Sequence, residues 1–278
     1  MPSQPGILAP VPAAATFLRL ALRPHVDAAA ALRPLRVPGE HVLVGLGTGM
    51  ASALGCVVDG LRPIPTLAAG RVTIPSTPCD VWLRIDGDDA GEVLHRRRVL
   101  DLSGFTVVDE TAAFRHGPSR DLSGYEDGTE NPTGDEAAEV ALADDGSSLL
   151  AVQRWVHDWA AFDAMSKEQQ DHTIGRERVS NEELDEAPAR AHVQRTAQED
   201  FSPEAFVVRR SMPWADPRGS GLMFLAFGAT LDPFEALLRR MLGLDDGIVD
   251  ALFDFTQPVD GATVWLPGLD EQGSLRLS

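Results

Sequence analysis

The chain has 278 residues, a hydrophobic fraction of 44% and a formal net charge of −18. This length suits one large domain or two ordinary ones, with enough apolar residues for a sizeable core. The negative charge excludes a nucleic-acid-binding protein, because binding a phosphate backbone requires clustered Lys and Arg. The basic run Arg96-Arg97-Arg98 is too short to change this, and we expect it to form a solvated face or a subunit contact. No segment is long and apolar enough to cross a membrane.

The N-terminus and the cysteines predict a cytoplasmic protein. Residues 1–14 are rich in Pro and Ala, and no basic residue precedes Arg19, whereas a secretory signal has a basic start. We expect residues 1–14 to be a disordered lead-in. Cys56 and Cys79 are too few for a disulfide framework and form no CxxC metal pair, which fits a reducing compartment.

Apolar patterning in the first half of the chain predicts the order strand, helix, strand, twice. The expected elements are a strand at 17–22, a helix at 25–33, a short apolar strand at 41–46, a strand at 80–85, a helix at 88–100 and a strand at 105–109. The pattern returns in the second half. It predicts strands at 149–156, 206–210, 221–227 and 263–266, and helices at 232–242 and 247–253.

Two sets of strands, each backed by helices, predict a duplicated α+β fold. We expect two ferredoxin-like halves with antiparallel sheets and flanking helices, at 15–135 and 136–268, followed by a tail at 269–278. The stretch 166–190 is polar and charged, with little apolar periodicity. It therefore predicts a long excursion over the surface.

Two familiar types of site are excluded by spacing. The glycines in the run Val44-Gly45-Leu46-Gly47-Thr48-Gly49 lack the third glycine of a dinucleotide fingerprint, because Met50 occupies that place. They are expected to make a turn. None of the seven histidines lies in an HExxH pair or beside a CxxC motif, so the sequence does not support a zinc site.

The stretch Gly124-Tyr125-Glu126-Asp127-Gly128-Thr129-Glu130-Asn131-Pro132 is the most informative in the chain. Glycines on both sides of Asp127 allow backbone conformations that other residues avoid, and Asn131-Pro132 ends any regular structure. Such a loop can aim a carboxylate at a ligand. An acidic surface turn has the same composition, and residues further along the chain decide between the two interpretations.

Those residues lie in Ala191-His192-Val193-Gln194-Arg195 and in the run from Val207 to Trp214. Together with the Asp127 loop, in this order and at these separations, they resemble the dye-decolorizing (DyP-type) peroxidases, and most closely the bacterial class B. The resemblance extends from about Phe17 to Leu266, and the Gly-x-x-Asp-Gly element is specific when a His and an Arg follow at these separations. It implies a fold that encloses one haem b per chain.

The resemblance also implies the haem-binding residues. His192 falls at the position of the proximal axial ligand of the haem iron. Asp254, an acid between apolar neighbours, is the candidate acceptor for the other ring proton of His192. Arg176 is expected to pair with a haem propionate, although an exposed arginine is an equal alternative. Ser211 stands where many relatives have Asn, which makes the binding of peroxide and water on the distal side differ from theirs.

The implied activity is reduction of hydrogen peroxide through an oxoferryl intermediate, followed by oxidation of dyes, phenolics or other one-electron donors. Asp127 would move the proton between the peroxide oxygens, and Arg209 would stabilise the developing negative charge. We expect Leu225 and Phe227 to form an apolar wall over the site. Electrons from large donors have five candidate relays, whose alternative role is core packing: Trp155, Trp159, Trp214, Trp265 and Tyr125.

Three other functions fit parts of the sequence. A haem carrier, store or sensor needs a ligating histidine, but not Asp127 and Arg209. The second is a protein that releases iron from haem. The third is a structural ferredoxin-like dimer without a cofactor. The resemblance further implies a homo-oligomer. The tail from Gly273 faintly resembles peptides that dock relatives inside bacterial nanocompartments, but a frayed terminus is the preferred interpretation.

Overall fold

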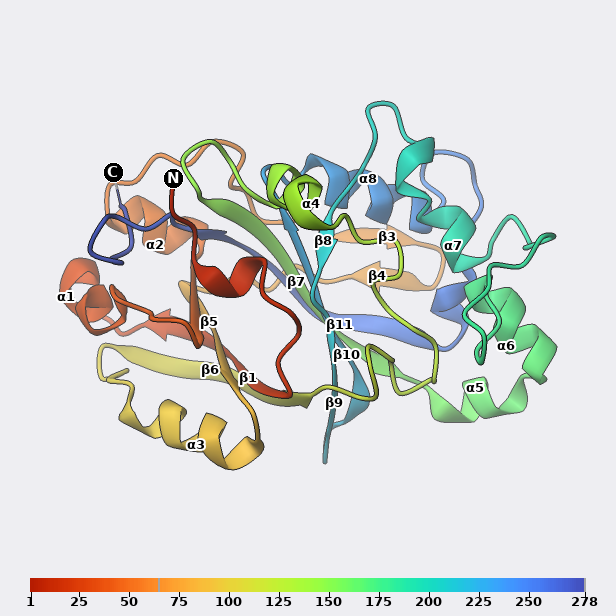
Figure 1. Cartoon of the computed structure of the whole chain (residues 1–278), viewed down its shortest axis with the longest axis horizontal. Helices are drawn as coiled ribbons and strands as arrows, with labels where there is room; N and C mark the ends of the chain where they lie inside the picture. The colour runs from red at the N-terminus through yellow and green to blue at the C-terminus, as the bar shows by residue number, and fades with distance from the viewer. Residues whose placement is uncertain (65, 278) are drawn as a thin grey trace.

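The first half of the chain follows a strand–helix–strand–strand–helix–strand order in a computed structural model that describes residues 1–64 and 66–277 (Figure 1). Its main elements are β1 (Ala14–Leu22), α1 (Ala28–Leu32), β2 (Val42–Leu46), β5 (Val81–Gly87), α3 (Ala90–Val99) and β6 (Phe105–Phe114). Between β2 and β5 lie α2 (Thr48–Ala53), β3 (Leu67–Ala69) and β4 (Val72–Ile74), and short 3₁₀ turns lie at η1 (Pro5–Ile7) and η2 (Arg33–Leu35). The four main strands pair antiparallel in the order β2-β5-β1-β6.

The second half repeats this order with additional helices. After α4 (Gly134–Ala141) come β7 (Ser148–His157), α5 (Trp159–Ala164), α6 (Lys167–Ile174), α7 (His192–Arg195), η3 (Gln198–Asp200), β8 (Val208–Arg209), β9 (Met212–Asp216), β10 (Gly219–Gly228), α8 (Asp232–Met241), η4 (Ala251–Asp254) and β11 (Thr256–Leu266). The helices α5, α6 and α7 are inserted between β7 and β8, at the end of the molecule opposite α1 and α3 (Figure 1).

The two halves share one antiparallel sheet. Its order is β7-β11-β2-β5-β1-β6-β9-β10-β8, and an additional pairing of β7 with β10 closes it into a barrel. The halves join through the pairs Ala113↔Trp214 and Trp265↔Leu46. In each half the strand order, numbered within that half, is 2-3-1-4, and a helix follows the first and the third strand. The predicted duplicated ferredoxin-like fold is confirmed.

Local signals in the sequence explain where several helices begin and end. The Asp89 side chain caps α3 by accepting a hydrogen bond from the Glu92 N–H. Ser166 and Gln169 form a capping box at the start of α6, and Gly175 ends this helix with φ of +95°. The apolar face of α8 packs Phe234, Leu237 and Leu238 into the core cluster on the sheet, and Met241 is also buried.

Three expected elements differ in the structure. The region 166–190 is not only a surface excursion, because α6 buries Asp171, Thr173 and Ile174. The capping box and the contacts of this helix outweigh its polar composition. The helix expected at 247–253 is instead a loop followed by the 3₁₀ turn η4, and the strand expected at 206–210 shortens to two residues followed by β9.

The terminal segments 1–14 and 269–277 pack against the rest of the fold, contrary to the expected disordered lead-in and frayed tail. Gln4 has no solvent exposure, because its side chain makes two hydrogen bonds with the backbone of Val44 in β2. Leu275 is also fully buried, and its N–H donates to the carbonyl of Arg36 at 2.7 Å. A bond from Leu269 N–H to the Pro2 carbonyl joins the two ends directly. Specific pairing with distant strands therefore overrides the Pro-rich and polar composition.

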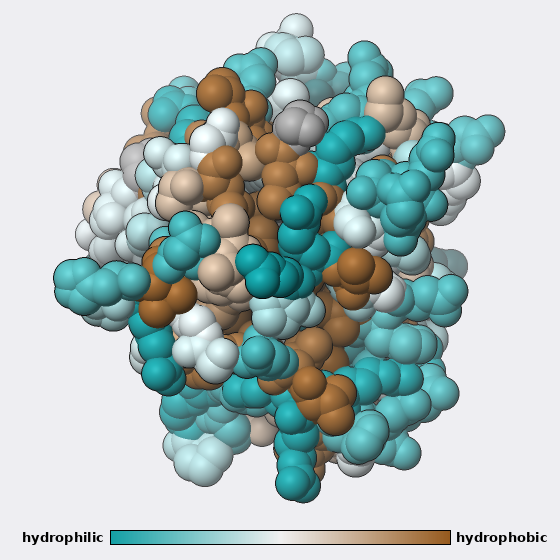
Figure 2. Space-filling view, turned by 90° about the vertical axis from the view of Figure 1, so that its left-hand side faces the viewer, coloured by the Kyte–Doolittle hydropathy of each residue, from teal (hydrophilic) through white to brown (hydrophobic). Residues whose placement is uncertain are grey.

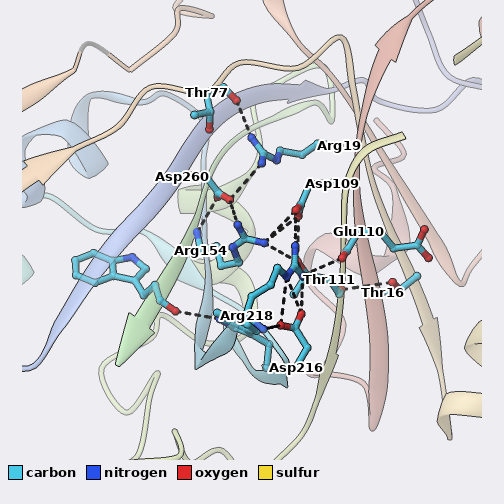
Figure 3. A network of polar contacts seen from close by, with 12 residues as sticks. Thr16, Arg19, Thr77, Asp109, Glu110, Thr111, Arg154, Asp216, Arg218 and Asp260 are labelled. Carbon is cyan, nitrogen blue, oxygen red and sulfur yellow. Dashed lines mark hydrogen bonds and ion pairs between the residues drawn. The ribbon is translucent and has the colours of Figure 1, made fainter. Parts of the chain in front are cut away.

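A network of arginines and aspartates ties the two halves together inside the barrel (Figure 3). Arg154 on β7 pairs with Asp109 on β6 at 3.0 Å and with Asp260 on β11 at 3.2 Å. Arg19 on β1 pairs with Asp260 at 3.3 Å, and Arg218 pairs with Asp109 at 2.7 Å. Burial raises the pKa of Asp260, despite the two guanidinium groups beside it. Each half thus supplies charges that the other half neutralises.

We expect Arg154→Met to lower the free energy of unfolding by about 3 kcal/mol, because it leaves two largely buried carboxylates without their shared partner. Its side chain is 13% exposed, whereas that of Arg218 is 42% exposed. The control Arg218→Met should cost less than about 1 kcal/mol, as exposed ion pairs usually do. Urea unfolding of both variants checks the prediction, and equal losses would contradict it.

Candidate active site

An apolar cavity of about 130 Å³ lies against the outer face of the second half-sheet. Side chains of β7 and β10 form its floor, and α7, α8 and the Asp127 loop surround it. Its apolar lining includes Trp155, Leu222, Phe224, Phe234, Leu237, Leu238, Met241 and Phe255. Its apolar and aromatic lining is typical of a site for a planar or aromatic ligand.

The prediction that Leu225 and Phe227 form an apolar wall over the site is wrong, because these side chains point to the opposite face of the sheet. Both residues have no solvent exposure and belong to the cluster inside the barrel, together with Phe17 and Val264. Their neighbours on β10, Leu222 and Phe224, line the cavity instead. Successive residues of a strand point to opposite faces of the sheet. A prediction that places the strand correctly but chooses the wrong face therefore exchanges the residues that line the cavity with those inside the barrel.

His192 is the first residue of α7 and lines the apolar cavity. Its Nδ1 lies 2.8 Å from Oδ2 of Asp250, a carboxylate whose side chain is fully buried. The other oxygen of Asp250 accepts the N–H of Leu252 at 2.8 Å, which holds the carboxylate in place. Nε2 of His192 makes no hydrogen bond with any residue that the structure describes, so it is the ring nitrogen available to a ligand.

The expected partner of His192, Asp254, is wrong. Its side chain is 42% exposed and pairs with Arg190 at 2.8 Å. Asp250 and Asp254 both stand among apolar residues, so composition does not distinguish them. The 3₁₀ turn of η4 decides the outcome, because it places Asp250 at the N-cap beneath α7 and Asp254 at the last position, toward solvent.

Asp127 and Arg209 face each other at the rim of the apolar cavity. Oδ1 of Asp127 lies 3.6 Å from Nε of Arg209, an ion pair that is too long for a hydrogen bond. Gly124 and Gly128 hold the loop around Asp127 with φ of +91° and +82°, and the Asp127 N–H donates to the carbonyl of Ser119 at 2.9 Å. Nε of Arg209 is buried and makes no hydrogen bond within the described residues, so it can still donate to a bound molecule.

Asn131 positions Arg209, a role that was not predicted from the sequence. Its side-chain oxygen accepts the Arg209 N–H at 2.8 Å, and its amide donates to the Arg209 carbonyl at 2.9 Å. This double hydrogen bond makes Asn131 equivalent to a neighbouring strand residue. The signal was present in the Asp127 motif, but it was interpreted only as a helix and strand breaker.

Ser211 lies in a second, more polar cavity of about 310 Å³ that meets the first at Asp127 and Arg209. Its hydroxyl is buried and has no hydrogen-bond partner among residues 1–64 and 66–277. Arg210 also lines this second cavity, with its guanidinium donating to the backbone of the N-terminal segment at Ala9. Arg209 therefore reaches both cavities, whereas Ser211 and Arg210 reach only the polar one.

Arg176 is 8% exposed and already paired with two carboxylates. Its Nη2 lies 2.5 Å from Glu130 and 3.1 Å from Glu183. It lines a third cavity, which also contacts His192 and Arg209. A contact between Arg176 and a ligand carboxylate would therefore have to displace one of these acids.

Comparison with known proteins identifies the family. The family model described as Dyp-type peroxidase, C-terminal, matches residues 118–271. A dye-decolorizing peroxidase of Mycobacterium tuberculosis is 34% identical over 254 residues, which cover 84% of this chain and 76% of that protein. The chain belongs to the Dyp-type peroxidase family.

Solved structures of Dyp-type peroxidases agree over nearly the whole fold. A dye-decolorizing protein from Vibrio cholerae superposes with a TM-score of 0.85 and 32% identity, covering 95% of this chain and 97% of that one. DyPB from Rhodococcus jostii RHA1 superposes with a TM-score of 0.86 and 29% identity, covering 95% of each chain. A variant of that protein in complex with haem has a TM-score of 0.85 and 31% identity, covering 95% of this chain and 96% of that one.

Two further polar pairs of this Dyp-type peroxidase were missed from the sequence, and at least one residue of each pair lines the apolar cavity. Nε2 of His157 lies 3.0 Å from Oδ1 of Asp121, and Nδ1 of the same ring lies 2.7 Å from the hydroxyl oxygen of Thr256. Burial acts to raise the pKa of Asp121, but its hydrogen bonds with His157 and Ser123 outweigh burial and lower the pKa. The second pair, Tyr125 and Asp171, is separated by 46 positions in the chain, so no local pattern could reveal it.

Proposed function

We propose that this protein is a haem-dependent peroxidase that reduces hydrogen peroxide and oxidises dyes, phenolics or other one-electron donors. The observation that carries the proposal is one apolar cavity that holds an imidazole backed by a buried carboxylate and, at its rim, a carboxylate facing a guanidinium. Membership of the Dyp-type peroxidase family supports the same activity.

The residues of the cavity fit haem b, one per chain. His192 would bind the iron through Nε2, because Nδ1 is engaged by Asp250. The apolar walls suit a porphyrin, and the buried Nε of Arg209 and Oγ of Ser211 lack partners among the described residues. Haem in the related DypB variant from Rhodococcus jostii supports this cofactor. When bound, haem iron supplies the redox chemistry of peroxide reduction.

Asp127 and Arg209 would share the work on peroxide. Asp127 accepts a proton from one peroxide oxygen and returns it to the departing oxygen. The guanidinium of Arg209 stabilises negative charge on that oxygen. Both groups lie where the apolar and the polar cavity meet, so the polar cavity is the proposed entrance for peroxide.

A single spectroscopic experiment tests the function. The haem-loaded protein should show a Soret band that changes after one equivalent of hydrogen peroxide, and a phenolic or dye donor should restore the original spectrum. A carrier or storage protein has no need for Asp127 and Arg209 and would bind hemin without this cycle. A protein that fails to take up hemin would overturn the proposal.

Asp250 should tune the haem by accepting the proton of His192, because a carboxylate there makes the imidazole more electron-donating. We expect Asp250→Asn to raise the reduction potential of the ferric haem, because the neutral amide removes this donation. Asp254→Asn is the matched control, four residues away on the same turn but exposed, and should leave the potential unchanged. Spectroelectrochemical titration measures both, and a larger change in the control would restore Asp254 as the partner.

We infer a homo-oligomer in the cytoplasm. The side of the molecule with the termini and α3 shows a band of apolar surface bordered by polar residues (Figure 2). Exposed apolar side chains on α3 and β6 include Leu94, Val99 and Val108, which suits contact with another copy.

The thiols of Cys56 and Cys79 are free, which suits a reducing compartment. No helix in the described residues could span a membrane.

The C-terminal tail does not support encapsulation in its folded position. A related peroxidase from Mycobacterium smegmatis is described as encapsulated, with a TM-score of 0.86 and 26% identity over 96% of each chain. In the present chain Leu275 is fully buried, and the Cys56 thiol donates to the carbonyl of Leu277. We propose that docking in a compartment would require this segment to be released first.

A further inference from the structure

Tyr125, the only tyrosine of the chain, is buried at the edge of the apolar cavity. Its side chain is held in a small cluster with Phe162, Ile174 and Phe255, and the residue is only 4% exposed. Its hydroxyl donates to Oδ1 of Asp171 on α6 at 2.5 Å. This is a short charge-assisted hydrogen bond between two groups that are both largely removed from water.

The Asp171 carboxylate is able to accept a proton from this phenol. Its Oδ1 also accepts the N–H of Arg178 at 3.2 Å, which fixes the carboxylate without neutralising it. Asp171 forms no ion pair with Lys, Arg or His in the part of the chain that the structure describes, unlike Asp250 or Asp127. Its Oδ1 therefore stays in place to take the phenolic proton of Tyr125.

The indoles that could also carry an electron lack such an acceptor. The Trp155 N–H donates to the amide oxygen of Gln153, and the Trp214 N–H donates to the Trp155 carbonyl. Neither oxygen takes up a proton under ordinary conditions. Arg154 and Arg218 also lie 5.5 and 5.9 Å from the Trp214 ring, where their charges oppose the formation of a radical cation. The Trp159 N–H donates to the hydroxyl of Ser220, which is no better as a base.

We propose that Tyr125 and Asp171 form a redox couple that passes single electrons into the cavity. The proposal rests on the proposed peroxidase function, because the haem site that has reacted with peroxide is the oxidant. In the step, the O–H bond of Tyr125 breaks, one electron leaves to the haem site and the proton moves to Oδ1 of Asp171. The products are a neutral tyrosyl radical and a protonated Asp171. A phenolic or dye donor then returns one electron, and Asp171 returns the proton.

This couple lets a donor that cannot enter the cavity reduce the haem site. The aromatic cluster around Tyr125 extends through Phe162 to the half-buried Trp159, with ring centroids 6.0 Å apart between these two. A purely structural role for the pair would need only the hydrogen bond. The redox role also needs Asp171 to be a base. Asp171→Asn removes the charge but keeps a hydrogen-bond acceptor, so it distinguishes the redox role from the structural one.

The chain is well suited to a direct test, because a label on tyrosine enters one position only. Haem-loaded protein grown with ring-deuterated tyrosine is mixed with one equivalent of peroxide, frozen rapidly and examined by electron paramagnetic resonance. We expect a radical signal that narrows with the label and is absent in Tyr125→Phe. Deuterated tryptophan should leave the signal unchanged. A radical signal that the tyrosine label does not alter would overturn the proposal.

Asp171→Asn provides the second part of the test. In this variant the label-sensitive radical signal should form about a hundredfold more slowly, because about a hundredfold is the lower end of the rate enhancement that a positioned base contributes. Peroxide should change the Soret band at the wild-type rate. Equal rates of radical formation in both proteins would show that Asp171 is structural and contradict the proposal. A protein whose haem spectrum does not respond to peroxide at all would instead contradict the peroxidase function.

The haem-free protein provides a readout that is independent of catalysis. Burial raises the pKa of Tyr125 far above its ordinary range, and the hydrogen bond with Asp171 raises it further. Titration of tyrosinate absorbance should therefore show no ionisation until the protein unfolds at high pH. In Asp171→Asn the ionisation should begin at lower pH. An ordinary phenol titration in the wild-type protein would show that the couple is not formed.

Discussion

Replacing His192 by alanine should weaken hemin binding at least about a hundredfold and abolish the normal Soret band. The expected loss exceeds the 10- to 100-fold cost typical of removing a residue that only orients a ligand, because His192 would be the ligand itself. Asp250, buried and held by the Leu252 N–H, keeps the ring oriented with Nε2 free. The cavity has no second histidine positioned in the same way, since His157 is bonded through both nitrogens.

Hemin titration followed by absorbance measures this effect. His172→Ala is the control, because His172 is exposed on α6 and does not line the cavity. It should bind hemin as the wild type does. An unchanged spectrum in His192→Ala would refute the axial role, and with it the proposed use of Asp250.

The second large effect is expected at Arg209. Arg209→Ala should slow the reaction of the haem-loaded protein with peroxide about a thousandfold, as loss of a preorganised charge donor can do. Asp127→Ala should slow it less, by about a hundredfold, because water can replace part of a proton shuttle but not a fixed guanidinium. The side chain of Arg209 is 16% exposed and that of Asp127 is 24% exposed, so the arginine acts in the drier environment.

Stopped-flow spectra of both variants establish the ranking. Arg115→Ala, an exposed arginine of the polar cavity, serves as the control for a general loss of positive charge and should react at close to the wild-type rate. Equal slowing in Arg209→Ala and Asp127→Ala would defeat the argument that charge stabilisation dominates. A slowing in the control of the same size would indicate long-range electrostatics instead.

Much of the fold followed from local patterns. Alternating apolar residues and the acidic cap of α3 predicted the two strand–helix–strand units, since period and capping act within a few neighbouring residues. The same reasoning failed at α6, where a polar composition concealed a capping box and a buried face. Hydrophobic period indicates a helix or a strand only when the buried residues are themselves apolar.

Residue types along the chain determined the chemistry that the site could perform. Asp127, His192 and Arg209 occur in an order and spacing that resemble one family, and the structure brings all three to one cavity. Tertiary structure alone decided which neighbours serve them. Asp250 rather than Asp254 meets His192, and Leu222 and Phe224 rather than Leu225 and Phe227 line the cavity. In each case a strand or turn offers two equivalent residues, and only packing against distant elements selects the face that is buried.

The closed barrel, the packed terminal segments and the Tyr125–Asp171 pair also depend on contacts between residues far apart in the chain. Sequence alone determined the types of most elements and the reactive groups of this protein, because those depend on near neighbours and on side-chain chemistry. The tertiary structure decided the partners of each group, because distance in space is set by the whole packed chain and leaves no local pattern.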